Sequence, residues 1–184
     1  LVGIMFNPFA LTPGFTGPEQ PRGDKPYVDE DLGQEVGPFM MATINTKNVH
    51  RSNLLQGHAY GADFAYDEMS VVTPGAPTEF TDLGGAGAPK PGEGPSKAER
   101  EAGFYDLLFV GIDADGKQVR GSVHGDKDPG YGSTSKIIAE TAICLVQEAP
   151  DVAGGVWVPG AALGDRLVKR LADRAGLTFK DETA

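Results

Sequence analysis

A glycine-rich turn that leads into an apolar helix is the part of the sequence best suited to chemistry. The turn runs Asp128-Pro-Gly-Tyr-Gly-Ser-Thr-Ser-Lys136. A helix that begins at Ser133 or Thr134 presents backbone N–H groups and the positive end of its dipole to the space above the turn. Gly130 and Gly132 allow positive φ angles and a close approach of the backbone to a ligand. We expect a site for a phosphate, carboxylate or carbonyl oxygen, with an ordinary glycine turn capped by Ser or Thr as the alternative.

A second group of polar side chains falls within a predicted helix. Residues 38–56 are predicted to be helical, because Pro38 suits a first helical turn and Gly57 suits a helix end. The second half of this helix is crowded with polar residues, namely Asn45, Thr46, Asn48, His50, Arg51, Ser52 and Asn53. Since Asn and Thr form helices poorly, local propensity does not account for this density. We interpret the group either as a solvated face or as the polar wall of a cleft.

The remaining segments predict an α+β fold in which helices cover a mixed, largely antiparallel sheet. The clearest signal is the turn 114–116, Ala-Asp-Gly, which predicts a hairpin of strands over 104–113 and 117–124. One face of the hairpin is expected to carry Leu108, Val110, Ile112, Val119 and Val123. The other predicted elements are a strand over 63–72, a capped helix from 96 to 103, a buried helix ending near 148, a strand over 155–158, a helix over 161–175 and an edge strand over 177–179. No run of βαβ units is visible.

The helix over 161–175 is strongly amphipathic. Its apolar stripe consists of Leu163, Leu167, Val168, Leu171 and Ala175. The opposite side carries Arg166, Lys169, Arg170 and Asp173. We therefore expect this helix to cover the sheet with its apolar stripe and to expose its charged side to water.

Two Pro- and Gly-rich stretches divide the chain. Residues 1–37 contain an apolar start and a Pro/Gly series, which predicts an extended connector or strap ahead of an α+β domain over 38–184. In the stretch 73–95, 11 of 23 residues are Gly or Pro, so we expect a mobile loop that is either a lid or a disordered insertion. Because position 1 is Leu and not Met, we also expect the chain to be part of a longer protein.

The composition excludes several classes of partner. With 184 residues, of which 40% are apolar and 23% charged, the chain can form a domain with a core. The net charge of -10 and the lack of Lys or Arg clusters argue against nucleic acid and anionic lipid. The single cysteine, Cys144, falls in an apolar helical pattern and is expected to be buried. No segment is apolar for long enough to span a membrane, so we expect a cytoplasmic protein or one peripheral to a membrane.

The motifs of a self-contained active site are missing. The nearest match to a nucleotide-binding Gly-x-Gly-x-x-Gly is Gly84-Gly-Ala-Gly87, which lies in the Pro/Gly-rich loop with no helix after it. No Walker loop, His-x-x-x-His spacing or Gly-x-Ser-x-Gly elbow occurs. The scattered His50, His58 and His124 are interpreted as surface or hydrogen-bonded residues. We therefore assign no cofactor-binding and no metal-binding residue to this chain, and expect another domain or subunit to complete any chemistry.

Several segments form an ordered series along nearly the whole chain. They are Asn7-Pro-Phe-Ala-Leu11, Pro38-Phe-Met-Met-Ala-Thr-Ile-Asn-Thr46, Val49-His-Arg-Ser-Asn53, Tyr60-Gly-Ala-Asp-Phe-Ala-Tyr66, Pro91-Gly-Glu-Gly-Pro95, Asp128-Pro-Gly-Tyr131, Gly155-Val-Trp-Val-Pro159 and Leu163-Gly-Asp165. The series resembles the second half of the saccharopine-dehydrogenase-like oxidoreductases, a group that includes the trans-acting enoyl reductases. Each motif is weak alone, and the ordered series is fairly specific.

This resemblance implies a role for the chain within a larger enzyme. Members of the group begin with a dinucleotide-binding domain, so the chain resembles the C-terminal, substrate-side and dimerisation half, with NAD(P) held by an N-terminal domain outside it. The resemblance implies a homodimer, an inactive chain when alone, and a small-molecule or lipid-like substrate. It also implies that the turn 130–136 and the helix end 45–53 line a cleft that faces the nicotinamide. The alternative is a natural stand-alone homologue.

Two functions of different classes remain open. In an oxidoreductase, Tyr131 and Lys136 are the candidates to polarise or protonate the acceptor, with Thr134 and the backbone at Gly130 as donors to an oxygen. Arg51, with Asn53 beside it, would then hold an acidic group of the substrate. The other function is a non-catalytic binding or dimerisation module that pairs with a second chain.

Overall fold

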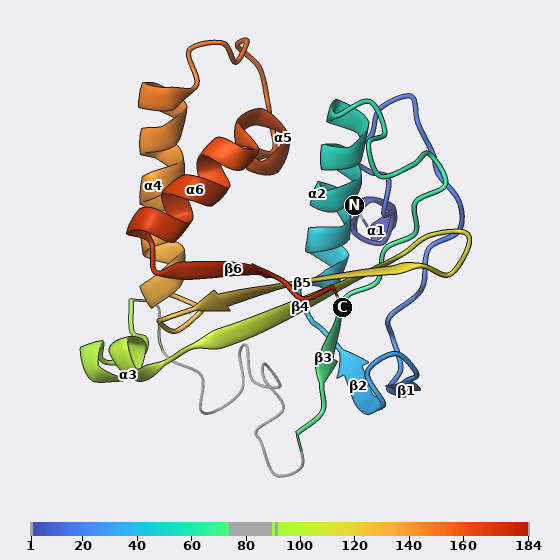
Figure 1. The fold of residues 1–184 in the computed structure, drawn as a ribbon, viewed down its shortest axis with the longest axis horizontal. Coiled ribbons are helices and arrows are strands. Elements are labelled where there is room, and N and C mark those ends of the chain that lie inside the picture. Colours follow the sequence, from blue (N-terminus) through green and yellow to red (C-terminus); the bar gives the residue numbers. More distant parts are fainter. Residues whose placement is uncertain (1, 74–89, 91, 184) are drawn as a thin grey trace. The chain divides into compact units, whose positions relative to one another are not determined.

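The computed structural model describes residues 2–73, 90 and 92–183 (Figure 1). The chain divides into two compact units, Leu1–Ala88 and Pro89–Ala184, which we call unit 1 and unit 2. The fold class is α+β, as the sequence predicts. The described strands form two three-stranded antiparallel sheets, one in each unit, where a single sheet was expected. Among the described helices, none is long and apolar enough to cross a membrane.

Unit 1 contains one long helix and a small sheet. Its elements are α1 (Val2–Met5), β1 (Tyr27–Asp29), β2 (Gln34–Pro38), α2 (Ala42–Leu55) and β3 (Met69–Val71). The strand order is β1-β2-β3, which places β2 in the middle. The segment 1–37, predicted to be an extended connector, thus contributes two strands. In the turn between them, the Asp29 side chain accepts the N–H of Leu32, and Gly33 takes a positive φ of 63°.

Two elements of unit 1 are shorter than predicted. Pro38 ends β2 and does not begin α2, because the strand ladder continues to this residue. The strand predicted over 63–72 is limited to β3. Before β3, the Gln20 side chain donates to the carbonyl of Phe64 at 3.3 Å and accepts the N–H of Tyr66 at 2.9 Å. These backbone groups therefore satisfy their hydrogen bonds outside a sheet.

Unit 2 places helices on one face of its sheet (Figure 1). Its elements are α3 (Lys97–Ala102), β4 (Tyr105–Ile112), β5 (Gln118–Gly125), α4 (Gly132–Glu148), α5 (Pro159–Leu163), α6 (Asp165–Arg174) and β6 (Leu177–Asp181). The strand order is β4-β5-β6. The predicted hairpin is confirmed, with Gly116 at a φ of 79°, and so is the capping box of Ser96 and Glu99. Most of the predicted loop over 73–95 lies outside the described residues.

The register of the β4–β5 hairpin divides its apolar residues between two faces. Directly opposite residues point to the same face. The pairs Leu107–Val123 and Leu108–Ser122 therefore place Leu108 and Val123 on opposite faces. The expectation of one shared apolar face is wrong, since one face carries Leu108, Val110 and Ile112 and the other carries Val119 and Val123. Val123 and its β6 neighbour Phe179 pack against the helices.

The core of unit 2 lies between the sheet and the helices α4, α5 and α6. It consists of Cys144, Ala149, Leu163, Leu167, Leu171, Ala175 and Leu177. The predicted apolar stripe of the last helix is confirmed except for Val168, whose side chain is exposed. The helix predicted over 161–175 is divided at Gly164, where a φ of 51° separates α5 from α6. No strand forms over 155–158, where the chain is irregular.

Two expectations about burial in these helices are wrong. Helix α4, expected to be buried on all sides, leaves Ile138 and Val146 exposed at 68% and 82%, because the other helices cover only part of its circumference. Arg170, expected on the water side of α6, is 8% exposed. Its guanidinium donates to Glu140 at 2.7 Å and also to Glu148, and both carboxylates belong to α4. The charged side of α6 therefore contributes to the contact between the two helices.

Candidate functional site

The turn before α4 is closed by its own aspartate. The Asp128 carboxylate accepts the N–H of Tyr131 at 2.9 Å and the N–H of Gly132 at 2.5 Å. The Asp128 carbonyl oxygen accepts the N–H of Ser133 at 2.9 Å. These three N–H groups, which the sequence analysis leaves open for a phosphate or carboxylate, are therefore already bonded. An added anion at this position would meet the negative charge of Asp128.

The glycines of this turn are explained by the short distances between their backbone and neighbouring atoms, and not by a positive φ. Neither Gly130 nor Gly132 takes a positive φ, contrary to our expectation. A Cβ atom on Gly132 would lie 2.5 Å from the Asp128 carboxylate and 3.1 Å from the carbonyl oxygen of Arg100. Thr134, a predicted substrate-binding residue, donates its hydroxyl at 2.6 Å to a carbonyl oxygen of the same turn.

Tyr131, the first predicted catalytic residue, borders a cavity of unit 2. Its side chain is 58% exposed, so it does not pack inward as a core aromatic residue. The cavity has a volume of about 520 Å³ and is lined by Gly92, Glu93, Gly94, Pro95, Arg100 and Tyr131. A Cβ atom on Gly94 would lie 3.4 Å from the Tyr131 ring, so this glycine keeps the space beside the ring open. The volume is within the range of small-molecule sites.

Helix α3 positions Arg100 at the same cavity. The helix begins with the capping box, in which Glu99 accepts the N–H of Ser96 at 2.7 Å. Arg100 donates from Nη1 to the carbonyl oxygen of Pro95 at 2.5 Å, and its own carbonyl oxygen accepts the N–H of Asp128 at 3.1 Å. This backbone bond joins α3 to the turn before α4. A cationic guanidinium and a phenol therefore border one hollow.

Arg100 and Glu93 also border this cavity, although they were not predicted to be site residues. Glu93 falls within the motif 91–95, Pro-Gly-Glu-Gly-Pro, which contributes to the family resemblance. No sequence pattern connects that motif with Tyr131, which lies far along the chain. The connection is made by the packing of α3 on the turn, where a Cβ atom on Gly103 would lie 2.7 Å from the Cα atom of Asp128.

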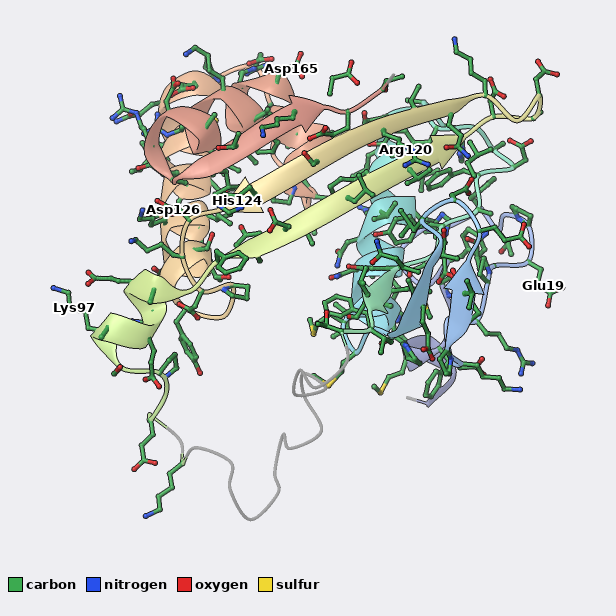
Figure 2. The ribbon with its side chains drawn as sticks, turned by 60° about the horizontal axis from the view of Figure 1, so that its bottom comes forward. Glu19, Lys97, Arg120, His124, Asp126 and Asp165 are labelled. Atoms are coloured by element: carbon green, nitrogen blue, oxygen red, sulfur yellow. The ribbon has the colours of Figure 1, made fainter. Side chains whose placement is uncertain are left out.

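Lys136, the second predicted catalytic residue, does not line the cavity of Tyr131. Its Nζ atom lies 3.8 Å from the carboxylate of Asp126, at the end of β5 (Figure 2). Asp126 in turn packs against Gly176, where a Cβ atom would lie 2.3 Å from its carboxylate. Lys136 therefore forms an ion pair near the junction of β5, α4 and β6.

The two predicted substrate-binding residues of unit 1 have partners within that unit. Asn53 is 3% exposed, and its amide donates to the carbonyl of Gly61 at 2.8 Å and accepts the N–H of Tyr60 at 2.9 Å. Asn53 therefore closes the turn that follows α2. Arg51 donates from Nη1 to the carbonyl oxygen of Leu11 at 3.0 Å. Other polar side chains of α2 bond to carbonyls of their own helix, namely Thr46, Asn48 and Ser52.

A half-buried carboxyl group in unit 1 has a shifted pKa. Burial raises the pKa of Glu68, and the hydrogen bond that Asn45 donates to its Oε1 at 2.9 Å opposes the shift. The other oxygen, Oε2, is buried without a hydrogen-bond partner among the described residues. Burial also raises the pKa of the nearby Tyr66 to about 12, with a contribution from the Glu68 charge. The Asn45 side chain is therefore hydrogen-bonded to Glu68 within unit 1. Its amide does not form part of an open polar wall.

A histidine that we did not select from the sequence forms an ordered pair with an aspartate. His124 on β5 (Figure 2) lies opposite Asp106 on β4. Its Nδ1 atom is 2.8 Å from the Asp106 carboxylate. The ring of Phe104 stacks on the imidazole with centroids 6.1 Å apart. The pair lies on the sheet face opposite the one that contacts the helices. The imidazole therefore has a carboxylate at one ring nitrogen and an aromatic ring against its face.

The described residues contain no parallel βαβ unit of the kind that binds a dinucleotide. Both sheets are antiparallel, so they lack the parallel βαβ unit whose helix start binds a pyrophosphate. At the longest helix, α4, the first N–H groups donate to Asp128. The same residues contain no group of three His, Cys, Asp or Glu side chains that could hold a metal ion.

Comparisons with known proteins relate this chain to one kind of reductase. No protein-family model and no solved structure matches it. Over 200 residues the chain is 32% identical to a Mycobacterium tuberculosis protein provisionally named a trans-acting enoyl reductase, with 90% of this chain covered. It is 30% identical over 203 residues to the trans-acting enoyl reductase of Mycobacterium bovis, with 91% of this chain covered. It is 31% identical over 176 residues to that of Mycobacterium ulcerans, with 82% covered. These matches cover 48%, 48% and 42% of the relatives, so the chain spans about half the length of the curated relatives it matches.

Proposed function

We propose that this chain is the substrate-side half of an enoyl reductase of the trans-acting kind. The observation that carries the proposal is its 32% identity, over 90% of its length, to a protein provisionally given that name. The relatives' name describes reduction of an enoyl group, so the proposed substrate is an α,β-unsaturated acyl compound. The ordered motifs from 7–11 to 163–165 support a place in the saccharopine-dehydrogenase-like group.

We place the NAD(P) cofactor of this reductase on a domain outside the chain. This proposal is supported by the antiparallel pairing of both described sheets and by the length of the relatives, which is about twice that of the part that matches. The chemistry that a reduced nicotinamide supplies therefore belongs to that other domain. The contribution of this chain is to bind the unsaturated acyl group and to hold a hydrogen-bond donor beside it.

Tyr131 is the residue that we assign to this donor role. Its exposed side chain borders a cavity large enough for a small molecule, and Arg100 borders the same cavity. A phenol can donate a hydrogen bond to the carbonyl oxygen of an acyl group, and a guanidinium can stabilise negative charge that develops there. Lys136 forms an ion pair with Asp126 and does not line this cavity, so the proposal gives it no contact with the acyl group.

A decisive experiment compares Tyr131→Phe with Tyr60→Phe in the full polypeptide that contains this chain. Turnover of an enoyl thioester with NADPH is measured beside thermal unfolding. Loss of one donor to a developing negative charge lowers kcat by roughly a hundredfold to a thousandfold, so Tyr131→Phe should do so at an unchanged melting temperature. Tyr60, an exposed tyrosine of unit 1, provides the matched control. Full turnover in Tyr131→Phe would contradict the assignment of Tyr131 to the site. A wild-type protein that reduces none of the enoyl thioesters would contradict the proposed reaction.

Assembly with a second copy of the chain is a second candidate function, favoured by strand β4. The outer edge of β4 pairs with no described strand, and its exposed apolar side chains are Leu107, Leu108, Phe109 and Ile112. Such an edge can add a strand from another chain. Sedimentation of the wild type should then show a dimer, and Leu108→Lys should shift it towards the monomer. A wild-type chain that sediments as a monomer at high concentration contradicts this function.

A further inference from the structure

A second cavity of unit 2 lies between the end of α4, the irregular segment after it and α5. It has a volume of about 320 Å³ and is lined by Leu145, Val152, Ala153, Gly154, Gly155, Trp157, Pro159 and Ala162. None of the residues of the Tyr131 cavity takes part in it. The proposed reductase function gives this cavity no role.

The lining of this cavity is apolar. All eight lining residues are glycines or carry apolar side chains, and none is charged. The one side-chain donor, the indole N–H of Trp157, is bonded to the carbonyl oxygen of Ala153 at 2.9 Å. The cavity opens to solvent, since Leu145 and Trp157 are 50% and 40% exposed, and an apolar occupant would remove the surface of these side chains from water. The lining therefore selects an uncharged, apolar occupant.

The surroundings of the cavity disfavour a negatively charged group. Leu145 lies in the last turn of α4, where the helix dipole is negative. Asp151 directly precedes the lining residue Val152. The nearby cation Arg166 is engaged by Asp151 through two hydrogen bonds of 2.6 and 2.7 Å. Exposed apolar side chains continue outside the cavity, with Val146 at 82% and Val156 at 86%.

We infer that this cavity binds the hydrocarbon chain of an uncharged amphiphile. A cavity of about 150 Å³ accommodates benzene, so a space of about 320 Å³ accommodates roughly twelve carbon atoms. The exposed valines continue the apolar surface from the cavity towards solvent, which suits a chain longer than the cavity itself. The inference rests on unit 2 alone and does not depend on the proposed function.

The chain provides its own probe for a test, because Trp157 is its only tryptophan and lines the cavity. The indole is 40% exposed, so a hydrocarbon that covers it should shift its fluorescence emission to the blue. Decanol titrated into the chain, below its own aggregation concentration, should give a saturable shift. Decanoate should need a roughly fivefold higher concentration for half saturation, because its carboxylate meets the negative end of α4.

Two variants that fill the cavity make the test specific. Gly154→Leu adds a side chain where a Cβ atom meets nothing within 4 Å, and Ala162→Leu enlarges another lining residue. Both should lose the decanol response at retained cooperative unfolding, whereas Ile138→Ser, which changes an exposed residue of α4 outside the lining, should keep it. If decanol gives no shift of the Trp157 emission in the wild type, or a shift that does not saturate, the inference is overturned. That result is expected if the cavity instead receives a side chain of a partner protein. A response that survives both Leu variants also overturns it.

Discussion

The carboxylate of Asp128 and the backbone nitrogen of Gly132 lie 2.5 Å apart, in a hydrogen bond that closes the start of α4. The same carboxylate also accepts the N–H of Tyr131. Because an internal anion occupies the helix start, the turn is a support for the Tyr131 side chain. It is not an open anion site of the kind that the glycines suggested.

Replacement of Asp128 should therefore weaken the start of α4. Asp128→Ala leaves two N–H groups without their acceptor, and loss of a helix cap lowers the free energy of unfolding by about 1 kcal/mol. Urea unfolding of Asp128→Ala, Asp128→Asn and the wild type measures this. Asp128→Asn keeps an acceptor and should lose less. Asp115→Ala, at the exposed hairpin turn, is the matched control, and an equal loss there would contradict the capping role.

The packing of α6 should respond unequally to two neighbouring truncations. Leu171 is 7% exposed and belongs to the core of unit 2, whereas Val168 is 42% exposed. Leu171→Ala should lower the free energy of unfolding by about 2 to 4 kcal/mol, since it leaves a cavity. Val168→Ala, which removes less and mostly exposed surface, should cost less than about 1 kcal/mol. Equal losses in chemical denaturation would show that the orientation of α6 is wrong.

The ion pairs of Arg170 should contribute more to thermal stability than ion pairs at the surface. Arg170→Met leaves the carboxylates of Glu140 and Glu148 close together without their shared cation. Lys169→Met, next to it, removes only an exposed pair with Asp173. Thermal unfolding of the two variants should show a clear fall in melting temperature for Arg170→Met and little change for Lys169→Met. A reversed order would contradict the buried contact between α4 and α6.

The pH dependence of stability should contain a contribution from Glu68. Burial raises the pKa of this carboxyl group in the folded chain, so the folded state binds its proton more tightly than the unfolded state. Its contribution to stability is therefore fully present below the ordinary pKa of glutamate and is lost as the pH rises through the raised pKa. Glu68→Gln should remove this loss, so that the variant gains stability over the wild type above that range. Denaturation across pH, with Glu19→Gln as an exposed control, measures the difference.

The chain by itself should bind neither NADH nor NADPH in the micromolar range of cofactor sites. Both sheets of the described residues are antiparallel, and the described helices offer no glycine-rich start after a parallel strand. Calorimetric titration of the purified chain measures this, with a known dinucleotide-binding dehydrogenase as the positive control. A saturable isotherm would contradict our assignment of the cofactor to another domain.

Local patterns were sufficient for several elements of unit 2. Asp115 and Gly116 define the hairpin because Gly116 takes the positive φ that the turn requires. The Ser96 and Glu99 pair begins α3 as a capping box, and the apolar spacing from Leu163 to Leu171 predicts the buried residues of α5 and α6, although not their division at Gly164. In each case the signal and its structural effect lie within a few residues of each other.

Features that depend on distant packing were not predictable in this way. Helical periodicity assigned Arg170 to water, because the pattern of one helix carries no information on the two glutamates of α4. Periodicity also did not show that β2 would extend to Pro38, which depends on pairing with β3. Likewise, Arg100 borders the Tyr131 cavity only because its carbonyl oxygen bonds Asp128. Tyr131 itself could be selected, since it stands in the turn that begins α4.

Because Cys144 is buried, the rate at which its thiol reacts can report how often unit 2 opens. This thiol is the only one in the sequence, it has no exposed surface, and burial raises its pKa. Alkylating reagents attack the thiolate, so they can reach Cys144 only while the packing of α4 and α6 is transiently lost. At high reagent concentration the modification rate equals the rate of that opening. Mass spectrometry of the wild-type chain during alkylation can therefore measure the rate at which unit 2 opens, without an introduced cysteine.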